Sequence, residues 1–156
     1  MKTIMVHMLD RAWTQEALHY ACLRARESGA DVALLRLVPT RSARWLGTEF
    51  SYRPLTVSGY DDLSEHLATA EDYGFQLELY HMTSLSTDEA LIQAAEQFNA
   101  GVIMTRPERS LVPYWNWFQT RRLEKLLRAR GCELCLLDPQ ANNDDLTVLK
   151  NSKIKG

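Results

Sequence analysis

The chain has 156 residues, of which 46% are hydrophobic and 24% are charged, and its formal net charge is −2. This length and composition predict one globular domain with a core of its own. No apolar run approaches the ~20 residues of a membrane span, and the N-terminus becomes polar too soon for a secretory signal. We therefore expect a cytoplasmic protein without a membrane span.

Apolar residues at two different spacings predict strands and helices that alternate along the chain. Thr14 is the candidate N-cap of the first helix, and Ser86 with Glu89 forms a candidate capping box for the third. Gly29 and Gly131 stop the first and last helices. The predicted strands cover residues 3–8, 31–38, 75–82, 102–105 and 132–137. The predicted helices cover residues 14–28, 61–74, 86–100 and 120–130.

Single helices between strands predict an α/β fold. We expect a five-stranded parallel sheet with right-handed crossovers and helices on both faces, an open, doubly wound, Rossmann-like arrangement. The domain should cover residues 1–138, and residues 139–156 should form a polar C-terminal tail. Ligands of such sheets bind outside the carboxyl ends of the strands, where the strand order reverses. The loops at that end include residues 9–13, 39–60 and 105–119.

These loops hold all four tryptophans, together with several arginines and Phe118. One interpretation is a crevice lined by rings and guanidinium groups, which would suit a flat anionic ligand. The other, which we favour, is that the aromatic side chains pack together and fill the crevice. The aromatic residues are Trp13, Trp45, Trp115, Trp117 and Phe118. The arginines are Arg11, Arg41, Arg44, Arg53, Arg106 and Arg109.

The cysteines and histidines do not predict a metal site. Cys132 and Cys135 form a C-x-x-C pattern, but it enters a strand, where residues three apart point to opposite faces. A redox pair sits instead at a helix start, where the thiol pKa is lowered. We therefore interpret the pair as structural. The four histidines are scattered, with no ligand spacing to the cysteines.

The charges are unevenly distributed. Residues 54–105 include nine acidic residues and no Lys or Arg, whereas residues 106–130 include seven basic and two acidic residues. Two interpretations stay open. Either the two segments form solvated helix faces that complement each other within the fold or across a dimer, or the basic segment binds an anion.

The order of these pieces resembles the universal stress protein family over residues 2–138. The similarity rests on "TIMVHMLDRAWTQEALHYA", "LLRLVP", "DEALIQAAEQFNAGVIMT" and "ARGCELCLLD". The resemblance implies the α/β fold predicted above. It also implies a homodimer that pairs through the last strand. This role suits an apolar edge strand, because the open edge of a sheet needs cover. The residues of that strand are Glu133, Leu134, Cys135, Leu136 and Leu137.

The resemblance also places an ATP-binding motif after the fourth strand, Gly-x-x-Gly-x9-Gly-Ser/Thr. Its glycines let backbone amides approach the phosphates. Here Thr105 and Glu108 replace the first two glycines, and strict spacing puts Phe118 and Gln119 at the last pair. One inserted residue would instead align Gln119 and Thr120, which keeps a hydroxyl. All three glycines are replaced, so the phosphate loop is degenerate.

Other contacts of the family match better. Asp10 matches the acidic residue at the end of the first strand, and Val38 matches the backbone site that contacts adenine. Arg109 matches a basic residue that follows the second glycine. The candidate nucleotide-binding residues are Asp10, Val38, Thr105, Arg106, Arg109 and Thr120. The sequence has no P-loop lysine and no general base other than Asp10, so we expect no catalytic residues.

The leading hypothesis is a homodimeric regulatory or binding protein without ATP turnover and without the usual ATP binding. The alternative is a protein that binds ATP or AMP in an atypical site lined by Arg and Trp. Nucleic-acid binding by residues 106–130 is disfavoured because the chain is slightly acidic overall. Membrane docking through "VPYWNWF" ranks lower still.

Overall fold

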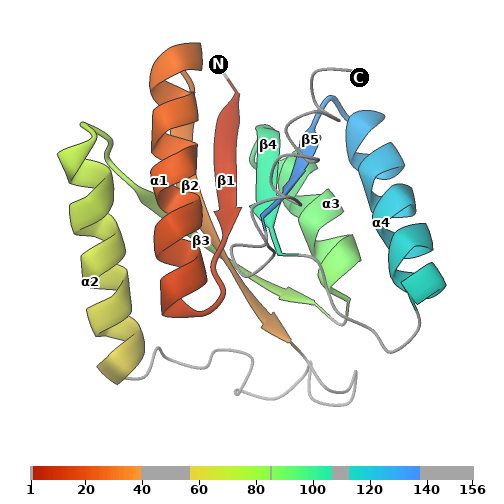
Figure 1. Cartoon of the computed structure of the whole chain (residues 1–156), viewed down its shortest axis with the longest axis horizontal. Coiled ribbons are helices and arrows are strands. Elements are labelled where there is room, and N and C mark those ends of the chain that lie inside the picture. The colour runs from red at the N-terminus through yellow and green to blue at the C-terminus, as the bar shows by residue number, and fades with distance from the viewer. Residues whose placement is uncertain (1, 40–56, 85, 107–112, 138–156) are drawn as a thin grey trace.

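Five strands and four helices alternate along the chain in the computed structural model (Figure 1), which describes residues 2–39, 57–84, 86–106 and 113–137. This alternation confirms the predicted order of elements. The strands are β1 Thr3–His7, β2 Asp31–Pro39, β3 Glu78–Ser84, β4 Ala100–Thr105 and β5 Glu133–Leu136. The helices are α1 Arg11–Ser28, α2 Val57–Asp72, α3 Thr87–Gln97 and α4 Pro113–Arg128.

The five strands form one sheet in the order β3-β2-β1-β4-β5, and every neighbouring pair is parallel. The first three strands build the sheet in one direction, and the chain then returns to add β4 and β5 on the other side of β1. The strand order therefore reverses between β1 and β4. This topology confirms the predicted parallel sheet and puts the reversal at the carboxyl ends of β1 and β4, which is where sheets of this kind bind ligands.

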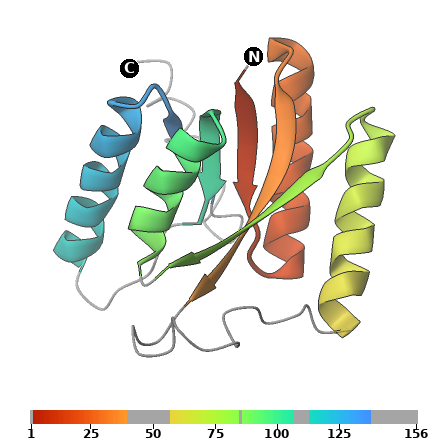
Figure 2. The same ribbon diagram turned by 180° about the vertical axis from the view of Figure 1, so that it is seen from behind.

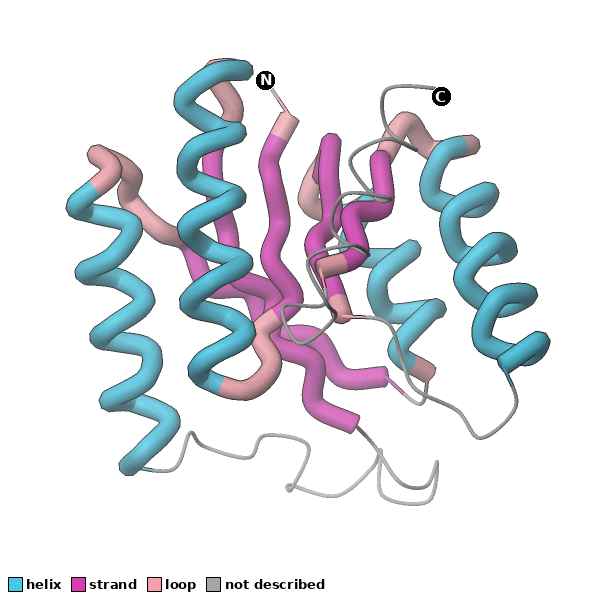
Figure 3. Tube along the Cα trace, viewed as in Figure 1, coloured by secondary structure: helices cyan, strands magenta, loops and turns pink. Residues whose placement is uncertain are grey.

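The helices cover both faces of the sheet, as predicted. Helices α1 and α2 pack side by side on one face, and α3 and α4 pack together on the other (Figures 1 and 2). Figure 3 shows the strands enclosed between these two helical layers. Alternate residues of β1 belong to two separate hydrophobic cores. Ile4 and Val6 pack under α1. Met5 packs on the other face with Leu91 of α3 and Leu127 of α4. Burial on both faces explains why the central strands are continuously apolar.

Helix α1 begins earlier than the sequence suggested. Its N-cap is Asp10, whose backbone is extended and whose side chain accepts a hydrogen bond from the Trp13 amide. The prediction of Thr14 as N-cap was wrong, although threonine is a good capping residue. Thr14 lies inside the first turn, where its buried hydroxyl accepts a hydrogen bond of 2.9 Å from the Leu9 amide. The helix ends, as predicted, at Gly29, which has a positive φ of 71°.

Two other helix starts also differ from the predictions. Ser86 occupies the N-cap position of α3, but its side chain makes no capping hydrogen bond, so the expected capping box is not formed. Helix α4 begins at Pro113, whereas the sequence predicted a loop as far as residue 119. Proline suits the first helical position because its φ is already helical and its missing amide hydrogen is not needed there. Trp117 and Phe118 are therefore part of a helix and not of a loop.

The two cysteines of the C-x-x-C pattern separate as expected. Cys135 packs in the core under α1, and Cys132 packs in the core under α3 and α4. Both are buried, and burial raises the pKa of the Cys132 thiol to about 11. A thiol with this pKa is poorly nucleophilic at neutral pH, which agrees with the structural interpretation. Among the described residues, no group of three or more metal-ligating side chains gathers at one place.

The acidic and basic segments meet in part within the fold. Helix α2 lies at one side of the molecule and α4 at the other, on opposite faces of the sheet (Figure 1), so these two helices do not complement each other. Helix α3 of the acidic segment packs against α4, and its Glu96 pairs with Arg130 of the basic segment. No described helix is both long and apolar enough to cross a bilayer. The predicted tail, residues 139–156, lies outside the described residues.

Candidate functional site

An ion pair joins the ends of β1 and β4 at the point where the strand order reverses. Arg106, the first residue after β4, contacts the Oδ2 atom of Asp10 through its Nη1 atom. The other oxygen of Asp10 accepts a hydrogen bond of 3.0 Å from the Trp13 amide. The hydrogen bond from the Trp13 amide and the contact with Arg106 together hold the pKa of the Asp10 carboxyl below its usual value. Burial acts in the opposite direction but has a smaller effect than these two together. Both oxygens of Asp10 are thus engaged.

A buried polar pair lies next to this ion pair. The Nδ1 atom of His7, the last residue of β1, lies 2.9 Å from the Thr105 hydroxyl at the end of β4. Burial and the positive charge of Arg106 lower the pKa of His7 to about 4, so the imidazole is neutral at pH 7. The sequence analysis missed His7 as a site residue. The sequence feature that could have indicated it is its position at the end of an apolar strand, three residues before Asp10.

Trp13 belongs to the core beside the site. Its side chain is only 3% exposed, and its Nε1 atom donates a hydrogen bond of 2.8 Å to the carbonyl of Leu137. The Leu137 amide in turn donates to the carbonyl of Thr105, at 3.0 Å. The ring therefore ties the first turn of α1 to the end of β5. This position agrees with packing rather than with a ring that stacks on a ligand.

Trp117 and Phe118 lie in a different environment. They are 59% and 58% exposed, and the guanidinium of Arg121 lies 4.9 Å from the centre of the Trp117 ring. This exposure is the opposite of what filling a crevice requires. The physical reason is the early start of α4, which carries both residues onto the helix and turns them toward solvent. Trp45 and the side chain of Trp115 lie outside the described residues.

Two of the remaining candidate residues lie on other elements. Val38 is half-buried on β2, opposite Thr83 of β3, and Thr120 lies inside α4. Arg109 and Glu108 lie outside the described residues. The structure therefore brings Asp10, Thr105 and Arg106 together, with His7 as an added member. Among the other arginines, Arg11 is held by Glu65 of α2, at 2.6 Å, rather than by this site.

Comparisons with known proteins identify the fold. No family model matches the sequence, and no curated protein matches it significantly. Solved structures do match, and the two described next each have a TM-score of 0.56. A universal stress protein from Archaeoglobus fulgidus is 14% identical, over 88% of this chain and 94% of that chain. A member of the same family from Burkholderia pseudomallei is 17% identical, over 87% of this chain and 95% of that chain.

Two further similar structures contain adenine nucleotides. A universal stress protein in complex with cAMP is 13% identical, over 88% of this chain and 96% of its own. The Archaeoglobus fulgidus protein in complex with dAMP is 14% identical, over 88% of this chain and 98% of that chain. Both alignments have a TM-score of 0.56. At these identities the comparison establishes the fold: the chain has the α/β fold of universal stress proteins.

Proposed function

We propose that this chain is a universal-stress-type regulatory or binding protein of the cytoplasm. In this proposal it acts as a homodimer, does not turn over ATP and does not bind ATP in the way usual for that family. The observation that carries the proposal is that Phe118, Gln119 and Thr120, which match the end of the family's phosphate motif, lie inside helix α4. The fold supports the comparison with universal stress proteins, and the residues after β4 support the loss of the usual site.

The backbone of α4 argues against a phosphate site at the matching positions. Only the first turn of a helix has amide hydrogens without an intrahelical partner. Phe118, Gln119 and Thr120 are the positions where the family motif would have its last glycine and hydroxyl residue, and all three lie beyond the first turn of a helix that begins at Pro113. Their amides serve the helix, so they are not available to cradle phosphates.

The test is binding of ATP, with and without Mg²⁺, followed by thermal unfolding and calorimetry. We expect no change in Tm and no heat of binding at about 1 mM ATP, which corresponds to an affinity weaker than about −4 kcal/mol. A dissociation constant in the micromolar range, or ATP found in the purified protein, would overturn the proposal. Release of phosphate at a rate above that of the buffer would also contradict it.

A second candidate function is binding of an adenine nucleotide with one phosphate. The similar structures with cAMP and dAMP favour it, as does Arg106, a half-exposed cation at the point where the strand order reverses. An incoming phosphate could draw this guanidinium from Asp10, because an exposed ion pair contributes only about 0–1 kcal/mol. The released Asp10 carboxylate could then accept hydrogen bonds from a ribose.

Titration with AMP and cAMP decides between the two candidates. If the second is correct, Arg106→Ala should weaken AMP binding by about tenfold or more, as expected for a charge-assisted contact. Arg128→Ala is the matched control, because Arg128 is an exposed arginine on α4 that pairs with Glu124. Equal affinities for the wild type and both variants would rule out a phosphate contact at Arg106.

The proposed dimer uses β5, which is an edge strand of the sheet. Leu134 and Leu136 of this strand are half-buried within one chain. The edge strand of a sheet is where a strand of a second copy can be added, so two β5 strands could extend the sheet across a dimer. The sheet order thus supports, at the level of topology, the interface that the family resemblance suggests.

A further inference from the structure

Two large aromatic side chains lie exposed near the start of α4. Trp117 and Phe118 each expose more than half of their surface, and neither is among the described residues of the two hydrophobic cores. A folded chain usually buries such rings, because their burial is favourable. Adjacent large apolar side chains on the outside are typical of a surface that contacts a partner. The function proposed above gives neither ring a partner.

Basic side chains share the exposed face of α4 with these rings. Arg121 and Lys125 follow Trp117 at intervals of four residues, so the three side chains lie in one row along the helix. All three are exposed, whereas Leu127 on the other side of the helix is buried. Phe118 projects about 100° around the helix axis from Trp117. The two cations therefore lie between the two rings, on what we call the aromatic-basic face.

The two cations of the aromatic-basic face are not neutralised by the described part of the chain. No carboxylate of the described residues pairs with Arg121 or Lys125. Arg121 instead lies with its guanidinium 4.9 Å from the centre of the Trp117 ring. The other cations of this region each act on a carboxylate. They are Arg122 near Asp88, Arg128 paired with Glu124, and Arg130 paired with Glu96.

The charges of the whole molecule favour one orientation on an anionic surface. Helix α2 contains five carboxylate residues and no Lys or Arg, and it lies at the opposite end of the molecule from α4 (Figures 1 and 2). An anionic surface attracts α4 and repels α2. Because salt screens charges beyond about 8 Å, the surface acts on the residues nearest to it. The net charge of −2 therefore does not prevent contact through α4.

We propose that the aromatic-basic face of α4 docks on the surface of a bilayer that contains anionic phospholipids. The rings of Trp117 and Phe118 enter the headgroup region, where aromatic side chains are favoured. Arg121 and Lys125 contact the lipid phosphates. The helix lies along the surface, as amphipathic helices do at membrane interfaces.

A nucleic acid fits this face less well than a bilayer. Bases stack on the faces of aromatic rings, but the guanidinium of Arg121 covers one face of the Trp117 ring. Phe118 projects in a different direction, so successive bases find no common platform. A bilayer requires only that rings and cations share one exposed side. The sequence alone ranked membrane docking lower, because it did not show that the rings are exposed.

Sedimentation with vesicles tests the proposal at an ionic strength of about 0.15 M. Vesicles of phosphatidylcholine with about 30% phosphatidylserine should bind the protein at least about tenfold more tightly than vesicles of phosphatidylcholine alone. The double variant Arg121→Gln, Lys125→Gln should weaken binding about twentyfold, because each cation near such a surface contributes about fivefold. Trp117→Ala and Phe118→Ala should each weaken it at least about fivefold, since less apolar area enters the interface.

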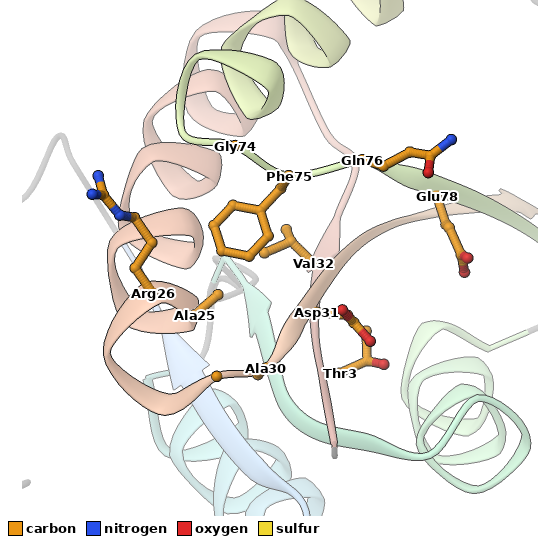
Figure 4. Close-up of a pocket in the computed structure, with 11 residues that line it drawn as sticks. Thr3, Ala25, Arg26, Ala30, Asp31, Val32, Gly74, Phe75, Gln76 and Glu78 are labelled. Atoms are coloured by element: carbon orange, nitrogen blue, oxygen red, sulfur yellow. The ribbon is translucent and has the colours of Figure 1, made fainter.

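Matched controls lie on α1, which covers the other face of the sheet. Arg26 belongs to the lining of a cavity of about 540 Å³ where the strands begin, and Figure 4 shows its guanidinium extending away from the neighbouring residues. Tyr20 is 43% exposed. Arg26→Gln and Tyr20→Ala each remove an exposed cation or ring far from α4, so both should leave vesicle binding within about twofold.

A fluorescence measurement places the contact at α4. Lipids brominated in their acyl chains should quench the tryptophan emission of the wild type more than that of Trp117→Phe, which keeps a ring at this position. The proposal is overturned by absence of binding at about 1 mM anionic lipid, by equal binding to the two kinds of vesicle, or by equal weakening in the α1 controls. Binding of a single-stranded oligonucleotide through the aromatic-basic face, without binding of vesicles, would also overturn it.

Discussion

His7 shows how one side chain at the candidate site depends on its surroundings. It is 7% exposed and contacts the Thr105 hydroxyl. Its pKa falls to about 4 because burial and Arg106 both disfavour the imidazolium. The unfolded chain therefore binds a proton at a higher pH than the folded chain. It follows that acid weakens the fold through this residue.

We predict a pH-dependent loss of stability that traces to His7. The contribution of His7 to the free energy of unfolding should be complete above pH 6.5. Stability should fall by up to about 3 kcal/mol as the pH drops from 6.5 to 4. Denaturant unfolding of the wild type and His7→Gln at a series of pH values measures this contribution. The difference between the two proteins should shift in favour of the variant as the pH falls. Parallel curves for both proteins would show that His7 is not responsible.

Two tryptophans allow a direct comparison of burial. Trp13→Ala should cost about 3–5 kcal/mol, because a large buried ring and its hydrogen bond to Leu137 are lost. Trp117→Ala should cost at most about 1 kcal/mol, since it removes only an exposed ring and its contact with Arg121. Urea unfolding measures both values. Similar large costs for the two variants would mean that Trp117 packs inside the molecule after all.

The start of α1 links local helix formation to the candidate site. Asp10 caps the helix and also pairs with Arg106, so its two roles can be separated by mutation. Asp10→Ala should destabilise the protein by about 1 kcal/mol through loss of the cap. Arg106→Ala should cost less, because the pair is exposed and well solvated. Equal losses in thermal unfolding would instead assign most of the effect to the ion pair.

At the scale of the whole molecule, the two edge strands of the sheet are the places where a second copy could extend the sheet. Strands β3 and β5 are the two edges. Leu136 of β5 is half-buried and is not among the described residues that form either core, whereas Thr83 of β3 is exposed. If β5 forms the dimer, a charge at Leu136 should disrupt the interface without removing a core residue.

We predict that Leu136→Lys shifts the protein from dimer to monomer at micromolar concentration, and that Thr83→Lys leaves the dimer intact. Sedimentation equilibrium measures both, and far-UV circular dichroism confirms that each variant is folded. A wild type that is monomeric under these conditions would contradict the proposed homodimer. Dissociation by Thr83→Lys alone would place the interface at the opposite edge of the sheet.

The sequence by itself determined the order of strands and helices and the parallel α/β class. These follow from spacings of apolar residues within short windows, such as the run 31–38, where β2 is found at Asp31–Pro39. It also determined the separation of Cys132 and Cys135, because strand geometry alternates sides residue by residue. The helix starts were less predictable, since Asp10 and Thr14 are both good caps and Pro113 suits either a loop or a first helical turn.

Only the tertiary structure decided which distant residues meet. Arg106 reaches Asp10 across 96 positions of sequence, and His7 reaches Thr105 across 98, because β1 and β4 are neighbours in the sheet. It also decided that Trp13 is buried while Trp117 is exposed, which no local pattern distinguishes. The physical reason is that local periodicity fixes which face of an element is apolar, whereas strand order and packing fix what that face and the loop ends contact.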